Sequence, residues 1–71
     1  MNNAFETQYG VEMIANDVAR MAPEMLIPAL VHMALVFGID RTEAAIQKTF
    51  TKADAETIIA AMNAWMELSM A

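Results

Sequence analysis

Apolar residues recur at helical intervals through most of the chain, with polar residues between them. In the first segment five apolar positions recur at intervals that place them on one face of a helix: Val11, Ile14, Ala15, Val18 and Met21. Asn3 and Glu6 have the spacing of a capping box at its start. The pattern predicts a first helix over 3–21, with Gly10 as a weak point because glycine lowers helix stability.

The second segment contains both prolines of the chain and its most apolar stretch. Pro23 suits a first helical position, where no amide donor is needed, whereas Pro28 predicts a kink or a restart inside the segment 23–37. From residue 29 to 37 the pattern is apolar on all sides, which predicts a central, buried helix. Gly38 is expected to end this helix in the left-handed conformation.

Two further helices are predicted over 41–50 and 52–70. Asp40 with Glu43, and Thr51 with Asp54, are spaced as N-terminal caps. The helix over 41–50 has one inner face, built on Ile46, Phe50, Ala45 and Thr49. The helix over 52–70 has two apolar stripes, where packing on a single core needs one. The first stripe holds Ala55, Ile58, Ile59, Met62, Trp65 and Met66, and the second holds Ala60, Ala61, Ala64 and Leu68.

These segments predict an all-α fold, a small bundle of about four helices in one domain over 1–71. No hairpin dipeptide and no long alternating run favours strands. A chain this short buries only about 60% of the surface of its unfolded state, so its stability is marginal. Since there is no cysteine to supply a disulfide, we expect homodimerisation to complete the bundle.

The composition excludes a disordered chain, because 58% of the residues are hydrophobic and only 18% are charged. The longest apolar stretch, over 25–37, has 13 residues, whereas a membrane-spanning helix needs about 20. The first twenty residues carry acidic side chains and no early cation, so no secretory signal is predicted. We therefore expect a cytoplasmic protein without a membrane span.

The net charge is −5, and its distribution disfavours nucleic-acid binding. Arg41, Lys48 and Lys52 lie close together in the sequence, but four acidic residues surround them and leave the local charge near neutral. The turn over 37–40, followed by these cations, has some helix-turn-helix character. A nucleic-acid-binding regulator that uses Arg41, Lys48 and Lys52 is therefore the alternative function.

Neither catalysis nor metal binding is predicted. The chain has one histidine and no cysteine, and no histidine–acid cluster at helical spacing. Its only serine, Ser69, has no base nearby, and there is no glycine-rich phosphate loop. We expect no enzyme activity, no cofactor and no metal. His32 lies in the most apolar stretch and is expected to be mostly buried or at an interface.

Eight methionines are the most unusual feature of the composition. Methionine serves either as core filler or as an adaptable contact surface. We expect core filling for Met13, Met21, Met25 and Met33. The last helix, where methionines flank the only tryptophan, is the candidate interface for a dimer or a partner. Its residues are Ala61, Met62, Ala64, Trp65, Met66 and Leu68.

The sequence thus predicts a small, acidic, non-enzymatic protein-binding module. We expect it to pair with itself and to modulate, in the first place to inhibit, another protein. Small autonomous proteins of this kind are often inhibitors or adaptors, including those carried by phages and mobile elements, so an accessory protein of that type is the expected class. A structural subunit of a larger assembly is the third hypothesis.

Overall fold

The chain folds into four α-helices and one short 3-10 turn within the described residues. The computed structural model describes residues 3–70, and the side chains of residues 10–69. The helices are α1 (Asn3–Ala19), α2 (Leu26–Phe37), α3 (Ile39–Thr49) and α4 (Lys52–Met70), with the 3-10 turn η1 (Pro23–Met25) before α2. No strand occurs over 3–70, so the all-α, four-helix prediction is confirmed. The predicted Asn3–Glu6 cap lies outside the described side chains.

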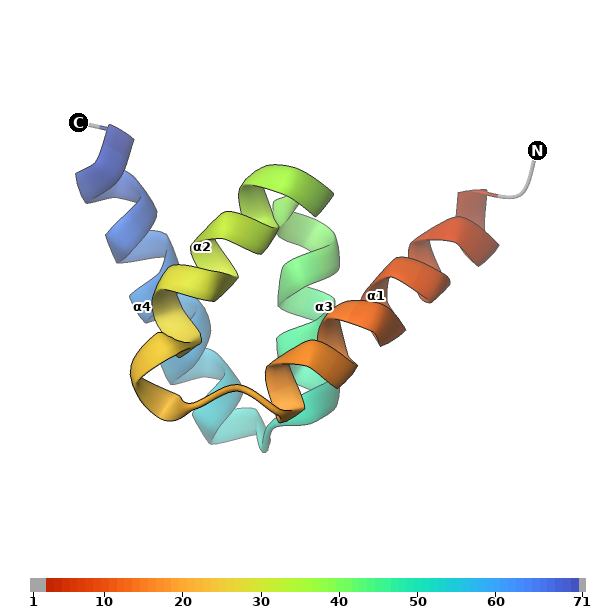
Figure 1. Cartoon of the computed structure of the whole chain (residues 1–71), viewed down its shortest axis with the longest axis horizontal. Helices are drawn as coiled ribbons and strands as arrows, with labels where there is room; N and C mark the ends of the chain where they lie inside the picture. Colours follow the sequence, from red (N-terminus) through yellow and green to blue (C-terminus); the bar gives the residue numbers. More distant parts are fainter. Residues whose placement is uncertain (1–2, 71) are drawn as a thin grey trace.

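The central helix is α3. It packs against α1, α2 and α4, whereas α1 and α4 lie on opposite sides of the molecule (Figure 1). Thr42, Ala45 and Ile46 of α3 are fully buried. Because threonine and alanine are small, the neighbouring helices can approach the α3 backbone closely.

The prediction that residues 29–37 form the central buried helix is wrong. Only Leu30, Val31 and Ala34 of α2 are buried, and Leu35 and Val36 are 66% and 58% exposed. A helix that is apolar on all sides has no preferred inner face, so the packing of the other helices decides which side it buries. Here α2 packs against α3 and α4, touches α1 as well, and leaves the side with Leu35 and Val36 to solvent.

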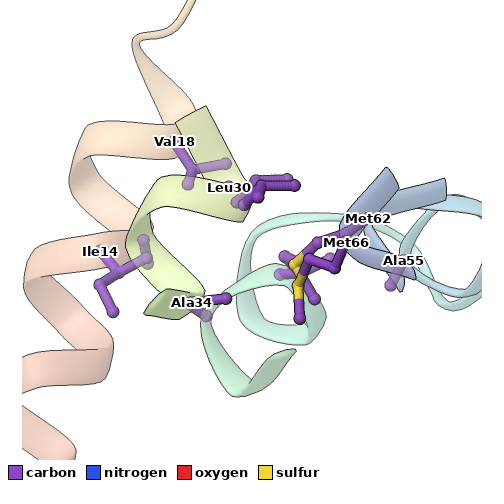
Figure 2. Packing of buried hydrophobic residues seen from close by; sticks show 11 residues of the cluster. Ile14, Val18, Leu30, Ala34, Ala55, Met62 and Met66 are labelled. Atoms are coloured by element: carbon purple, nitrogen blue, oxygen red, sulfur yellow. The ribbon is translucent and has the colours of Figure 1, made fainter. Parts of the chain in front are cut away.

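The core collects one face from each helix (Figure 2). Ile14 and Val18 of α1 are buried as predicted, and Leu30 and Ile46 join them from α2 and α3. The prediction for the methionines is wrong in part. Met13 and Met25 are 46% and 57% exposed, and Met21 and Met33 are half-buried. The methionines that fill the core are instead Met62 and Met66 of α4, which point into the cluster in Figure 2.

The prolines divide the second segment as the sequence predicts. Pro23 opens the turn η1, and the amide of Met25 donates to the carbonyl of Ala22 at 3.0 Å. A new helix then starts at Leu26, which places Pro28 in its first turn. Amides there have no intrahelical acceptor, so proline costs α2 no hydrogen bond.

Gly38 joins α2 to α3 as a single-residue turn. Its amide donates to Ala34 at 3.0 Å, and its carbonyl accepts the amide and hydroxyl of Thr42 at 3.2 and 3.0 Å. The φ angle of 106° is positive as predicted, but ψ of 145° is extended, so the conformation is not left-handed helical. With glycine as N-cap, α3 begins at Ile39 and the predicted Asp40 cap is wrong. The Thr51 cap is confirmed, because the Asp54 amide donates to Thr51 Oγ1 at 3.2 Å.

Candidate interaction surface

Helix α4 has two apolar faces. On the inner face Ala55, Met62 and Met66 are buried in the chain's own core. Burial therefore corrects the assignment of Met62 and Met66 to an intermolecular surface, since neither side chain is available to a partner. The other predicted interface residues are all exposed: Ala61, Ala64, Trp65 and Leu68.

The outer face of α4 is continuous along the helix. Ile58, Ala61, Trp65 and Leu68 follow one another at steps of three, four and three residues, which is the spacing of a coiled-coil seam. We call these four residues the α4 seam. Ile58 is half-buried at its edge, Trp65 is 47% exposed and Leu68 is 81% exposed. The sequence pattern assigned Ile58 and Trp65 to the inner stripe, whereas the structure places both at the border between the two faces.

The seam ends in a shallow apolar depression. Trp65, Leu68 and Ser69 line about 260 Å³ of open space there. The last turns of α4 extend beyond the other helices at the upper left of Figure 1. A tryptophan beside such a depression is a typical anchor for a protein contact, because it buries a large apolar area with few rotatable bonds.

A second apolar surface lies on α2. Pro28, His32, Leu35 and Val36 share one side of the helix, and all four are exposed. We call them the α2 strip. Residues 25–39 contain no Asp, Glu, Lys or Arg, so no charge interrupts the strip. The sequence argument missed this surface because it expected the helix to be buried, although the spacing of these residues was a signal that they share a face.

His32 is exposed on this strip. The expectation that the single chain buries most of this side chain is wrong. Its alternative, a histidine at an interface, stays a prediction.

The chain has no match among protein-family models, curated proteins or solved structures.

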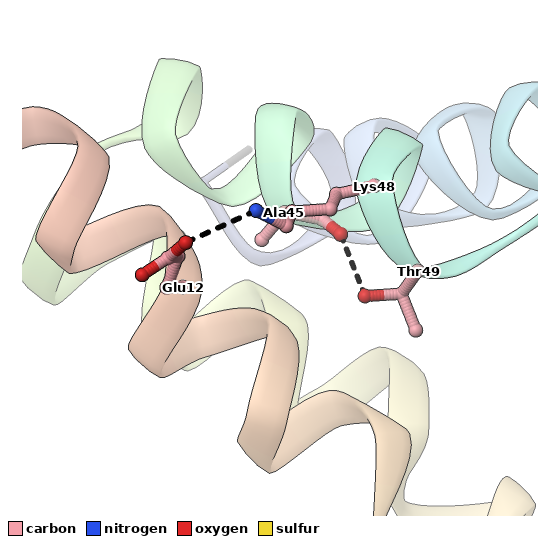
Figure 3. Close-up of polar contacts among 4 residues, drawn as sticks. All are labelled: Glu12, Ala45, Lys48 and Thr49. Atoms are coloured by element: carbon pink, nitrogen blue, oxygen red, sulfur yellow. Dashed lines mark hydrogen bonds and ion pairs between the residues drawn. The ribbon is translucent and has the colours of Figure 1, made fainter.

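The cations named in the nucleic-acid alternative lie beside other groups of the chain. Lys48 Nζ lies 3.3 Å from Glu12 Oε1, where it donates a hydrogen bond and forms an ion pair between α3 and α1 (Figure 3). The Arg41 stem crosses α1 at Gly10, where an added Cβ would lie 3.4 Å from Arg41 Cδ. Lys52 lines a depression of about 310 Å³ together with Glu56. Two of the three cations are thus engaged with α1 or paired with an acid.

The polar groups inside the described part are satisfied locally. Thr42 is the only buried polar residue there, and its hydroxyl donates to the Gly38 carbonyl at 3.0 Å. The Thr49 hydroxyl donates to the Ala45 carbonyl at 2.8 Å (Figure 3).

Among the described side chains no three potential metal ligands lie together. No helix over 3–70 has the length and apolar character to cross a bilayer.

Proposed function

We propose that the chain is a small, acidic, non-enzymatic protein-binding module that works as a homodimer and modulates a protein partner. The observation that carries this proposal is the pair of exposed apolar surfaces, the α4 seam and the α2 strip, on a chain of 71 residues. Monomeric proteins of ordinary size rarely expose large contiguous apolar patches outside binding sites.

The exposed area supports association. The accessible surface is 4949 Å², whereas a compact monomer of 7.8 kDa exposes about 4,400 Å². The chain thus exposes more surface than a compact monomer of its mass, and Trp65 and Leu68 belong to that surface, being 47% and 81% exposed. Pairing with another chain would remove surface that this fold leaves uncovered.

The two surfaces suit different partners. In the α4 seam the small Ala61 lies between the large Ile58 and Trp65, which favours packing against a large side chain of a second helix. The α2 strip is broad, free of formal charge, and separate from the seam in sequence. The net charge of −5 opposes unlimited association of the remaining surface. When a protein partner docks on the α2 strip, the module covers part of the partner's surface. The simplest effect on the partner is therefore steric inhibition.

Self-association is tested with two variants of α4, each of which adds one negative charge on a different side of the helix. Leu68→Glu puts the charge on the seam, and Asn63→Glu puts the same charge on an exposed position of the same helix that faces away from the seam. Light scattering at tens of micromolar should give a dimer for the unmodified chain and Asn63→Glu, and a single chain for Leu68→Glu. Melting temperature should rise with concentration for the first two only. A single-chain mass with constant melting for the unmodified protein contradicts the homodimer.

The partner surface is tested by affinity capture with mass spectrometry. The bait is the unmodified chain, Leu35→Glu on the α2 strip, or Asn63→Glu as a control for charge. We expect a protein that is retained by the unmodified chain and by Asn63→Glu, and lost with Leu35→Glu. A captured set that Leu35→Glu leaves unchanged contradicts the role of the α2 strip.

A further inference from the structure

We infer that two copies of α4 pair antiparallel along the α4 seam, with Trp65 of each copy packed on Ala61 of the other. This inference rests on the proposed homodimer and specifies its geometry. It follows from the order of large and small residues in the seam, from the position of Asp54 on the same line of the helix, and from the exposure of Trp65 and Leu68.

The spacing of the seam allows one register in which every seam residue has a partner. Ile58 and Trp65 are one heptad apart, and Ala61 and Leu68 are one heptad apart. In an antiparallel pair, Ile58 and Trp65 of one copy face Ala61 and Leu68 of the other. Trp65 then faces Ala61 of the second copy, and Leu68 faces Ile58, so four layers form without a gap or an overhang.

The sizes of the facing side chains favour this direction over the parallel one. A parallel pair places identical residues opposite one another, so one layer would hold two tryptophans and the next would hold two alanines. Protein interiors are packed to nearly uniform density, and such a pair combines an overfilled layer with a cavity. The antiparallel pair matches the largest side chain of the seam with the smallest in two of its four layers.

The charges favour the same direction. Asp54 is exposed and lies one further step along the seam, four residues before Ile58. A parallel pair brings Asp54 next to Asp54 of the second copy, where the like charges repel. In the antiparallel register these two positions are separated by about 27 Å along the helix axis, well beyond the distance at which salt screens exposed charges.

The open edge of the seam allows close approach of the second helix. The exposed residues alongside it are Thr57 and Ala64, which are small and uncharged. The opposite edge is continuous with the chain's own core through Met62. The paired helices would therefore join the two cores, as in an interface of the isologous type.

Engineered disulfides test the direction, because the chain has no cysteine of its own. Ile58→Cys with Leu68→Cys in one chain should yield a covalent dimer under mild oxidation, since the antiparallel register brings these positions face to face across the pair. Within one chain they are about 15 Å apart, too far for a disulfide. Each single variant should stay unlinked, because equal positions on the two copies are also about 15 Å apart along the axis.

Asn63→Cys, on the exposed side of α4 that faces away from the seam, measures cross-linking by random collision. Ala64→Cys is a second positive variant for the case that the double variant fails to fold, because Ala64 is exposed. The antiparallel register brings the two copies of this position to the same side of the pair at nearly the same level. A parallel pair places them on opposite sides.

Covalent dimers from the double variant or from Ala64→Cys, without cross-linking of Leu68→Cys or Asn63→Cys, support the antiparallel seam. Rapid cross-linking of Leu68→Cys alone shows a parallel pair and overturns it. Cross-linking of Asn63→Cys at the same rate as the double variant overturns it as well. If no variant cross-links while light scattering still shows a dimer, this geometry fails and the proposed homodimer stands. A single-chain mass for the unmodified protein contradicts both the antiparallel geometry and the proposed homodimer.

Discussion

Helices α3 and α4 are neighbours in the sequence, and they differ in what lies opposite their buried face. Behind the buried Thr42, Ala45 and Ile46, helix α3 exposes polar residues such as Gln47 and Lys48. Behind its own buried residues, helix α4 exposes the apolar Ala61 and Leu68. Polar side chains on an outer face are hydrated by water, and Lys48 also pairs with Glu12 of α1. The outer face of α4 gains free energy only when another apolar surface covers it.

The largest expected difference between the two helices is in the free energy of unfolding lost when a large apolar residue, buried on α3 or exposed on α4, is replaced by alanine. Ile46→Ala on α3 should lower the free energy of unfolding by about 2–5 kcal/mol, because it leaves a cavity at a fully buried position. Leu68→Ala should change it by less than about 0.5 kcal/mol in dilute solution, because this side chain is 81% exposed. Urea unfolding followed by circular dichroism measures both. Equal losses at low concentration would mean that the outer face of α4 belongs to the chain's own core.

A smaller difference is expected from two threonines that make the same local hydrogen bond. The hydroxyl of Thr42 donates to Gly38 at 3.0 Å, and that of Thr57 to Ala53 at 3.1 Å. Substitution by serine keeps the hydroxyl and removes one methyl group. Thr42→Ser should cost about 1 kcal/mol, because its methyl group is fully buried, and Thr57→Ser should cost less than about 0.5 kcal/mol. Thermal unfolding in dilute solution measures the loss of unfolding free energy in both variants. An equal loss would contradict the burial of Thr42.

The smallest effect is expected for the ion pair that joins α3 to α1. Glu12→Gln removes the ion pair with Lys48, and both side chains are 53% exposed. The loss should be below about 1 kcal/mol and should disappear at high salt. Glu67→Gln on α4 makes the same change in net charge at an exposed position and serves as the control. Melting temperatures at low and high salt measure the difference. A loss that persists at high salt would show that more than this ion pair joins α1 to α3.

The number of helices and most of their bounds, to within two residues, could be predicted because local signals set them, whereas α2 begins at Leu26 and not at residue 23. The apolar period of α1, the two prolines, Gly38 and the Thr51 cap all act within a few residues. Periodicity also identified Ile14, Val18 and Ile46 as inner residues, because these helices have polar residues on their other side. The structure confirms each of these three by its burial.

The place of α2 could not be predicted in this way. Its all-round apolar pattern contains no information about which side faces the core, and the central place depends on how closely other helices can approach. That place goes to α3, through the small residues Thr42 and Ala45. The same uncertainty applies to the methionines, since a long flexible side chain suits either a core or a surface. The outer face of α4 was accessible to prediction, because a second apolar stripe on one helix exceeds what a single core can cover.

The division of the methionines between core and surface also determines how the chain meets an oxidant. Met13 and Met25 are open to solvent, whereas Met62 and Met66 are enclosed by the packed helices. Oxidation converts the thioether into a polar sulfoxide and reaches accessible sulfur atoms first. Mild oxidation therefore adds polarity to α1 and to the turn before α2, while the sulfur atoms that hold α4 on the core stay reduced.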